Sequence, residues 1–161
     1  MTELSSLSRP IALLLKERGE TVAVSESAAG GLISAALLAI PGASSYFMGG
    51  GVVYTRDARR AILRFSEEAA LQPGSTEPYA LAAARAIRER LGTAWSLAES
   101  GAAGPTGNSY GDPAGHCCFA VSGPVERTLT IATEESDREA NMWAFAEAGL
   151  GLLEETLRDH G

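Results

Sequence analysis

Residues 21–40, TVAVSESAAGGLISAALLAI, decide the fold class of this chain. The β-branched run Thr21 to Val24 predicts a short strand, and the small and polar residues Ser25 to Gly31 predict a turn. The apolar run Leu32 to Ile40, which ends at Pro41-Gly42, predicts a helix. A strand, a loop and a helix in this order are the building unit of α/β proteins.

The remainder of the chain continues the same alternation. Apolar spacing predicts further helices at residues 4–17, 57–65, 77–91 and 137–158, and further strands at residues 46–54, 94–98, 116–121 and 127–132. Ser136 and Glu139 have the spacing of a capping box at the start of the last helix. The run Gly49-Gly50-Gly51 indicates a bulge or a close backbone approach. We predict an α/β fold, a three-layer α/β/α sandwich on a mixed sheet that is parallel early and antiparallel late.

Length and charge limit the classes of function. The 161 residues, 45% of them hydrophobic, fit one domain over residues 1–161. A formal net charge of −7 disfavours binding of extended nucleic acid, although backbone N–H groups can still bind a small anion. The first residues show no signal-peptide pattern, and the longest apolar run is far below the roughly 20 residues that span a bilayer. We therefore expect a cytoplasmic protein without a membrane segment.

The cysteines and histidines give weak signals. Cys117 and Cys118 are neighbours in a predicted strand, so their side chains point to opposite faces and indicate neither a disulfide framework nor a metal site. His116 is the one histidine inside the body of the chain, and a lone strand histidine is more often packed or solvent-facing than a general base. A serine hydrolase that uses His116 has only this residue in its support. We predict no metal and no cofactor.

Two loops rich in small residues are the candidates for chemistry. The first, Ser25 to Gly31, ends a strand and opens a helix, where free N–H groups and the helix dipole favour an anion or a developing oxyanion. Ser27 supplies a hydroxyl there, but serine is also a preferred helix N-cap. The second, Ser100 to Ser109, matches neither a Walker A motif nor a dinucleotide fingerprint. Its amides could approach a ligand phosphate, or it could be a surface loop rich in turn formers.

The segment Tyr54 to Arg60 places an aromatic hydroxyl and three arginines directly after a predicted strand. These guanidinium groups could clamp a phosphate or a carboxylate. A second interpretation is a solvated helix start that is capped by Asp57. The sequence leaves both interpretations open.

Five short blocks carry a family resemblance across almost the whole chain. They are Glu26-Ser27 through Gly30-Gly31, Pro41-Gly42-Ala43-Ser44, Gly51-Val52-Val53-Tyr54, Thr76-Glu77-Pro78, and Ser100-Gly101 through Ala103-Gly104-Pro105. In this order and spacing they resemble the CinA C-terminal domain family, whose bacterial members include nicotinamide-mononucleotide amidases. The resemblance implies a three-layer α/β/α fold, a homo-oligomer, and metal-free hydrolysis of the nucleotide carboxamide to the acid and ammonia.

The resemblance also implies roles for individual residues. Ser27 falls at the nucleophile position, Tyr54 at an active-site tyrosine, and Arg59 at the position of a lysine that serves as the base. The positions that it implies for ligand binding are Gly30, Gly31, Thr55, Ser100, Gly101, Gly104, Thr106, Gly107 and Arg138. The two loops are then expected to hold the phosphate and the oxyanion of a small nucleotide or another small anion.

The sequence departs from the family pattern at the base. Arginine stays protonated to a pH above about 12, so Arg59 cannot accept the serine proton, and Lys16, the one lysine, lies in the first predicted helix. Other departures are Ala28 and Ala29 beside the nucleophile, Asp112 in place of a lysine and Met142 in place of an arginine.

Two hypotheses follow from these departures. The first is an amidase that uses Ser27 together with another proton carrier, such as Tyr54 or His116. The second is an inactive or altered paralogue that binds a nucleotide or small anion, or that serves as an assembly module.

Overall fold

The central sheet has apolar side chains on both faces, and helices therefore cover both. In the computed structural model, which describes residues 3–161, Val22 and Val24 point into one core and Ala23 into the other. The strands are β1 Val22–Glu26, β2 Phe47–Val52, β3 Trp95–Gly101, β4 His116–Ser122 and β5 Arg127–Ala132. Their order in the sheet is β2-β1-β3-β4-β5. The neighbours of β1 run parallel to it, whereas β4 and β5 are antiparallel, so the predicted mixed sheet is confirmed.

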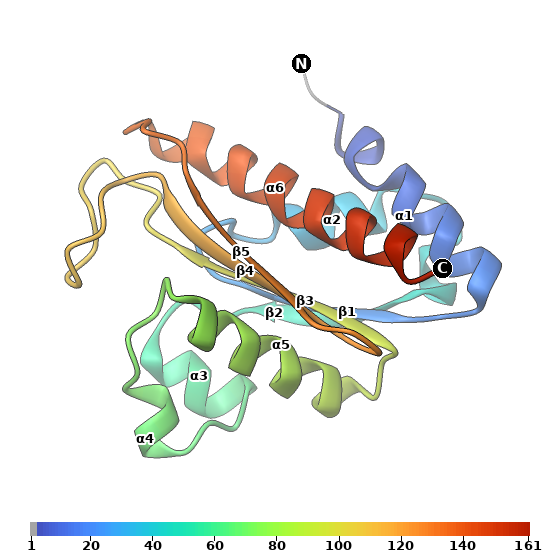
Figure 1. The fold of residues 1–161 in the computed structure, drawn as a ribbon, viewed down its shortest axis with the longest axis horizontal. Coiled ribbons are helices and arrows are strands. Elements are labelled where there is room, and N and C mark those ends of the chain that lie inside the picture. Colours follow the sequence, from blue (N-terminus) through green and yellow to red (C-terminus); the bar gives the residue numbers. More distant parts are fainter. Residues whose placement is uncertain (1–2) are drawn as a thin grey trace.

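The helices form a layer on each side of this sheet (Figure 1). One layer holds α1 Leu4–Arg18, α2 Leu32–Leu38 and α6 Arg138–Asp159; the other holds α3 Arg56–Ile62, α4 Glu67–Ala70 and α5 Glu77–Leu91, and a single 3-10 turn spans Ala43–Ser45. The two cores are correspondingly separate. Phe119 and Leu97 of the sheet share one core with Phe145 of α6, and Ala98 shares the other with Tyr79 of α5. The predicted three-layer α/β/α sandwich is confirmed.

The glycine run of β2 makes the predicted close backbone approach, and a bulge directly precedes it. The register between β1 and β2 shifts from Val22 opposite Phe47 to Ala23 opposite Gly49, which is a bulge. At Gly50 an added Cβ would lie 2.0 Å from the carbonyl oxygen of Val24, so no larger residue fits there. The strand itself is shorter than the predicted span of residues 46–54.

The start of α6 corrects one prediction. Asp137, and not Ser136, is the N-cap, because its carboxylate accepts the N–H of Ala140 at 2.8 Å. The amides of Ser136 and Asp137 are bonded to the carboxylate of Glu135, which holds this segment outside the helix. The capping box is therefore wrong, although the helix lies where it was predicted.

Two strands extend further than predicted. β1 continues through Ser25 to Glu26, and β3 continues to Gly101, so residues assigned to the two loops belong to the sheet. The helix α4 was not predicted, since four residues carry no periodicity. Of the helices within residues 3–161, none has the length and apolarity needed to cross a membrane.

Candidate functional site

The chain reverses its direction of travel across the sheet at β1. From β1 it passes through α2 to β2 on one side, and from β2 through α3, α4 and α5 to β3 on the other side of β1. The ends of β1 and β3 therefore form a topological switch point, which is where ligands bind in open α/β sheets. Glu26 is the last residue of β1, and Glu99 to Gly101 close β3.

Glu99 holds the turn that carries Ser27. Its Oε1 accepts the N–H groups of Ser27 at 2.9 Å and Ala29 at 2.8 Å, and its Oε2 accepts that of Ala28 at 3.1 Å. The side chain is 2% exposed. Burial raises the pKa of Glu99 to about 7, the amides of Ala29 and Ser27 oppose that rise, and the nearby Glu26 adds to it.

Glu26 holds the other half of the same segment. Its carboxylate accepts the N–H groups of Gly31 and Ile33 at 3.0 Å each, and of Ser34 at 2.8 Å. The start of α2 is thus capped by Glu26 and not by Ser27, which corrects the capping interpretation of that serine.

The amides of this first turn are consequently all bonded within the chain. Those of Gly30 and Leu32 donate to the carbonyls of Ser27 and Ala29. The N–H groups that the sequence analysis expected to be free for an anion are occupied by two buried carboxylates. Within residues 3–161, the Oγ of Ser27 makes no hydrogen bond, and the residue is 9% exposed.

A small pocket brings six of the predicted residues together. Its lining includes Tyr54, Gly101, Gly104, Thr106, Gly107 and Arg138, and its volume is about 170 Å³. The guanidinium of Arg138 donates to the hydroxyl of Tyr54 at 2.9 Å and to the carbonyl of Gly104. Arg138 thereby ties the end of β2, the second loop and the first turn of α6 into one wall.

Arg59 lies elsewhere and is buried. Its Nη1 donates to the carbonyls of Ala70 at 3.0 Å and Gln72 at 2.8 Å, and its guanidinium carbon lies 4.2 Å from the centre of the Tyr79 ring. Its Nε is buried without a partner in the described part of the chain. Arg59 makes no hydrogen bond to Ser27 among residues 3–161.

The other predicted positions have structural partners. Ser100 accepts the N–H of Ser75 at 3.1 Å through its Oγ, and Thr55 caps α3 by accepting the N–H of Ala58 at 3.1 Å. Asp57 is therefore not the cap of that helix, and instead forms an ion pair with Arg60 at 2.8 Å.

Gly30 and Gly31 both adopt positive φ, 68° and 104°, which explains two adjacent glycines at the end of the first turn. The terminal methyl of Met142 would lie 2.8 Å from a Cβ at Gly30, so α6 packs directly against this turn.

His116 is engaged by a backbone carbonyl, and both cysteines are buried. The Nε2 of His116 lies 2.8 Å from the carbonyl oxygen of Ser75, and Asp112 lies 3.7 Å from the same nitrogen. Cys117 and Cys118 are buried in opposite cores, as predicted. Residues 3–161 contain no group of three or more His, Cys, Asp and Glu side chains able to hold a metal ion.

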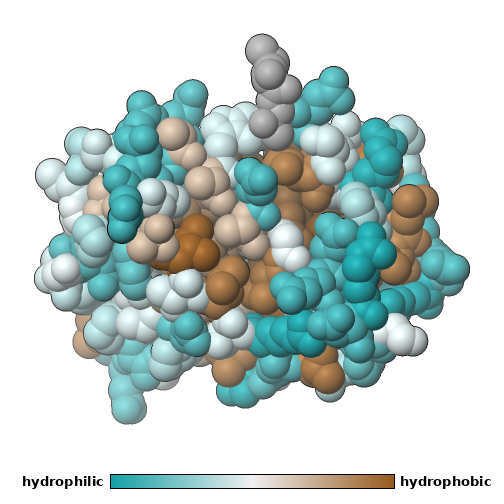
Figure 2. Space-filling model, turned by 45° about the horizontal axis from the view of Figure 1, so that its top comes forward, coloured by the Kyte–Doolittle hydropathy of each residue, from teal (hydrophilic) through white to brown (hydrophobic). Residues whose placement is uncertain are grey.

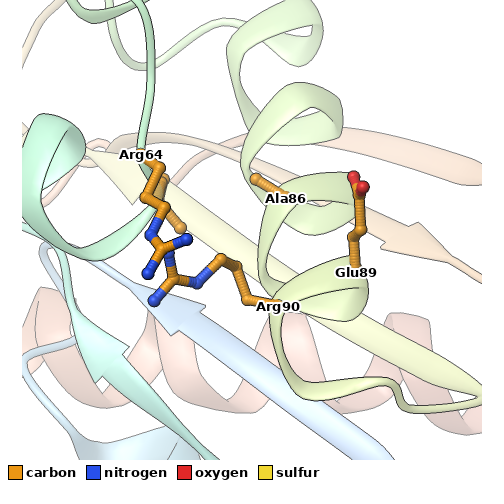
Figure 3. Close-up of a pocket in the computed structure, with 5 residues that line it drawn as sticks. Arg64, Ala86, Glu89 and Arg90 are labelled. Atoms are coloured by element: carbon orange, nitrogen blue, oxygen red, sulfur yellow. The ribbon is translucent and has the colours of Figure 1, made fainter.

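A wider hollow of about 550 Å³ lies on the layer of α3 and α5. Figure 3 shows the guanidinium groups of Arg64 and Arg90 side by side there, with the carboxylate of Glu89 turned away from them. Its lining contains none of the predicted site residues.

The comparisons with known proteins decide the family. The model of the CinA C-terminal domain matches residues 4–157. This chain belongs to the CinA C-terminal domain family. It is 43% identical over 120 residues to a CinA-like protein of Prochlorococcus marinus, which covers 74% of this chain and 28% of that protein. A CinA-like protein of Salinibacter ruber is 35% identical over 144 residues, or 89% of this chain and 35% of that protein.

Solved structures of the CinA superfamily share the whole fold. A competence-damaged protein superfamily member from Klebsiella pneumoniae has a TM-score of 0.90 at 27% identity and covers 98% of this chain and 99% of its own. The competence/damage-inducible protein of Agrobacterium tumefaciens has a TM-score of 0.88 at 28% identity with the same coverage. The chain spans about a third or less of the length of the curated relatives it matches.

Sequence reasoning missed the two carboxylates that organise the site. Glu26, Glu77 and Glu99 look too widely spaced to form a pair, and only the adjacency of β1 and β3 brings Glu26 and Glu99 together. A usable signal was present, since each of the two ends an apolar strand and parallel neighbours end at one edge.

Proposed function

We propose that this CinA-family chain is an amidohydrolase that cleaves the carboxamide of a nicotinamide-mononucleotide-type substrate, with Ser27 as the nucleophile. The observation that carries the proposal is the setting of Ser27. Its turn is fixed at the switch point by two carboxylates, while its hydroxyl forms no hydrogen bond with any of residues 3–161. The family includes amidases of this type, which supports the choice of substrate class.

The reaction is an acyl transfer through an ester. The Oγ of Ser27 attacks the carboxamide carbon, its proton passes to the leaving nitrogen, and the C–N bond breaks to release ammonia. Water then hydrolyses the ester to the acid and restores the serine hydroxyl. Arg59 cannot carry the proton, because a guanidinium does not give up its own proton at neutral pH.

Tyr54 is the proton carrier that we assign. Its hydroxyl oxygen accepts a hydrogen bond from Arg138 and retains its own O–H for a ligand. His116 is less suited, since its Nε2 is engaged with the carbonyl of Ser75.

The second loop, and not the first, is the anion-binding element in this proposal. Within residues 3–161, the amides of Gly104, Thr106 and Gly107 donate to no other group, in contrast to those of the Ser27 turn. Together with Arg138 they line a pocket of about 170 Å³. That volume is below the roughly 300 Å³ at which whole-ligand pockets begin, so the pocket admits only part of a nucleotide, and we assign the phosphate to its loop amides and Arg138.

Ammonia release from nicotinamide mononucleotide tests the proposal. We expect release by the unaltered protein, loss of at least about 100-fold in Ser27→Ala, and an increase in KM in Arg138→Ala. Ser45→Ala, at an exposed serine of the 3-10 turn, is the matched control and should retain full activity. Equal release from the unaltered protein and from Ser27→Ala removes the proposal.

The second candidate function is a non-catalytic binder of a nucleotide or small anion. It is favoured by Arg59, because its guanidinium donates to two backbone carbonyls and cannot act as a base. Calorimetry separates the two candidates: heat of binding that is lost in Arg138→Ala, without ammonia release, supports the binder. No heat with any pyridine nucleotide leaves only an assembly role.

Self-association is part of the same proposal. With the α1–α6 side turned forward, Figure 2 shows apolar side chains gathered near the middle of the surface. Leu13 of α1 and Leu38 of α2 are exposed apolar residues of this layer. Sedimentation equilibrium tests the expectation, and a monomer at every concentration contradicts it.

A further inference from the structure

Glu99 is an anion buried without a cation. Its carboxylate takes part in no ion pair within residues 3–161, and its ligands are three backbone amides and the thiol of Cys117, whose Sγ lies 3.5 Å from Oε2. Burial of a charged group is costly, and backbone hydrogen bonds offset that cost only where all of them are made. If this position served packing alone, an apolar side chain would fill it without the cost of burying a charge.

The three amides that Glu99 holds belong to the residues around the proposed nucleophile. Glu26 accepts the later amides of Gly31, Ile33 and Ser34, so the division between the two carboxylates falls just beyond the Ser27–Ala29 turn. β1 and β3 are each bonded on both sides and form the centre of the sheet. Glu99 therefore connects the turn to a rigid strand from another part of the chain.

We propose that Glu99 is a positioning residue: its ionised carboxylate fixes the Ser27–Ala29 turn in the conformation that presents the Ser27 hydroxyl to a ligand, and its protonation releases the turn. The catalytic consequence rests on the proposed function. The effect of Glu99 on the turn does not.

The charge on Glu99 can change at neutral pH. Burial raises its pKa to about 7, and the titratable groups close enough to influence it are Glu26 on β1, Cys117 on β4 and, across the sheet, Tyr79 on α5. Burial also raises the pKa of Cys117 well above its ordinary value, so this thiol stays protonated and donates to Oε2. Tyr79 likewise has a pKa raised by burial and stays neutral. With Cys117 protonated and Tyr79 neutral, the charge of Glu99 changes near pH 7 while theirs does not.

Protonation weakens the turn for a geometric reason. The ionised carboxylate accepts the Ser27 and Ala29 amides on Oε1 and the Ala28 amide on Oε2. A carboxylic acid carries a hydrogen on one of these oxygens, which then faces a donor and loses strength as an acceptor. Glutamine creates the same conflict permanently, because its amide nitrogen is a donor.

Amide hydrogen exchange, read by NMR and corrected for intrinsic rates, tests the proposal without any substrate. In Glu99→Gln we expect the protection of Ala28 and Ala29 to fall at least about tenfold, as for loss of one hydrogen bond to a charged group. Glu147→Gln removes the same charge from an exposed site of α6 and should leave both amides unchanged. Unchanged protection in Glu99→Gln overturns the proposal.

The unaltered protein provides a second measurement should Glu99→Gln fail to fold. The amide shifts of Ser27, Ala28 and Ala29 are expected to titrate together with a midpoint near pH 7, and three flat profiles between pH 5.5 and 9 overturn the proposal.

Activity separates this inference from the proposed function. In an active enzyme, kcat/KM should rise with pH through about 7, and Glu99→Gln should give a lower and flatter profile. No ammonia release, with the expected loss of amide protection, refutes the amidase and leaves the positioning role supported. Ammonia release together with unchanged amide protection in Glu99→Gln supports the amidase and refutes the positioning role.

Discussion

Replacing Glu99 by glutamine removes one buried charge at nearly constant side-chain volume, and the pH dependence of stability measures what that charge costs. The pKa of Glu99 is raised from 4.5 to about 7 in the folded protein. Each tenfold change in proton affinity is worth about 1.4 kcal/mol, so the folded state loses roughly 3 kcal/mol from this group as it ionises. The folded state holds the proton more tightly than the unfolded state. The stability is therefore fully present below pH 4.5 and is lost as pH rises to about 7.

Urea unfolding between pH 4.5 and 8 is the assay. We expect the free energy of unfolding of the unaltered protein to fall across this window by roughly 3 kcal/mol more than that of Glu99→Gln. For a chain of 161 residues this corresponds to a relative decrease in Tm of about 6–12 °C. Glu147→Gln controls for the loss of a surface charge and should follow the unaltered protein. Parallel curves for the unaltered protein and Glu99→Gln refute the reasoning.

Five further substitutions test the fold and the site by urea unfolding. Arg59→Lys keeps the charge but shortens the side chain and removes the planar group over the Tyr79 ring, so we expect a loss of roughly 2 kcal/mol together with any gain in ammonia release from a restored amine base; unchanged stability contradicts a structural role of the buried guanidinium. Gly50→Ala should destabilise by about 3 kcal/mol through overpacking. Gly151→Ala, where no atom of residues 3–161 lies within 4 Å of the added Cβ, should stabilise α6 by up to about 1 kcal/mol, and equal effects at the two glycines would count against the close approach of Gly50 to Val24. Asp137→Ala should cost about 1 kcal/mol and Ser136→Ala less than about 0.5, since the aspartate is the cap; the reverse order restores the capping box.

The fold was predictable because its signals are local. Helical spacing, β-branched runs and glycines at turns each lie within one element, and together they give the mixed sheet and both helix layers. The errors fall where distant residues intervene. Glu99 and Ser100 look like loop residues because they are polar, yet the amides of the distant Ser27 turn and of Ser75 allow them to lie buried in β3.

The site was predictable only in part for the same reason. The pocket around Arg138 is assembled from motifs that the sequence analysis had identified. The hydrogen bond between Ser27 and Glu99 joins residues 72 positions apart, and no local pattern reports it. Arg59 shows the converse case. An arginine directly after a strand resembles a ligand-binding residue. In the structure, however, the carbonyls of Ala70 and Gln72 accept its hydrogen bonds.

Protonation of Glu99 should change the stability of the whole fold and the stability of the Ser27–Ala29 turn in opposite directions. Relative to the unfolded chain, the folded protein binds the Glu99 proton more tightly, so acidification towards pH 4.5 stabilises the fold. Relative to an open turn that leaves Glu99 buried, the closed turn binds that proton less tightly, since it supplies the amides of Ser27 and Ala29, which favour the ionised form. The same acidification therefore opens the turn. Urea unfolding and exchange at Ala28 should accordingly diverge below pH 7, and a parallel change in both would mean that the turn opens only by global unfolding.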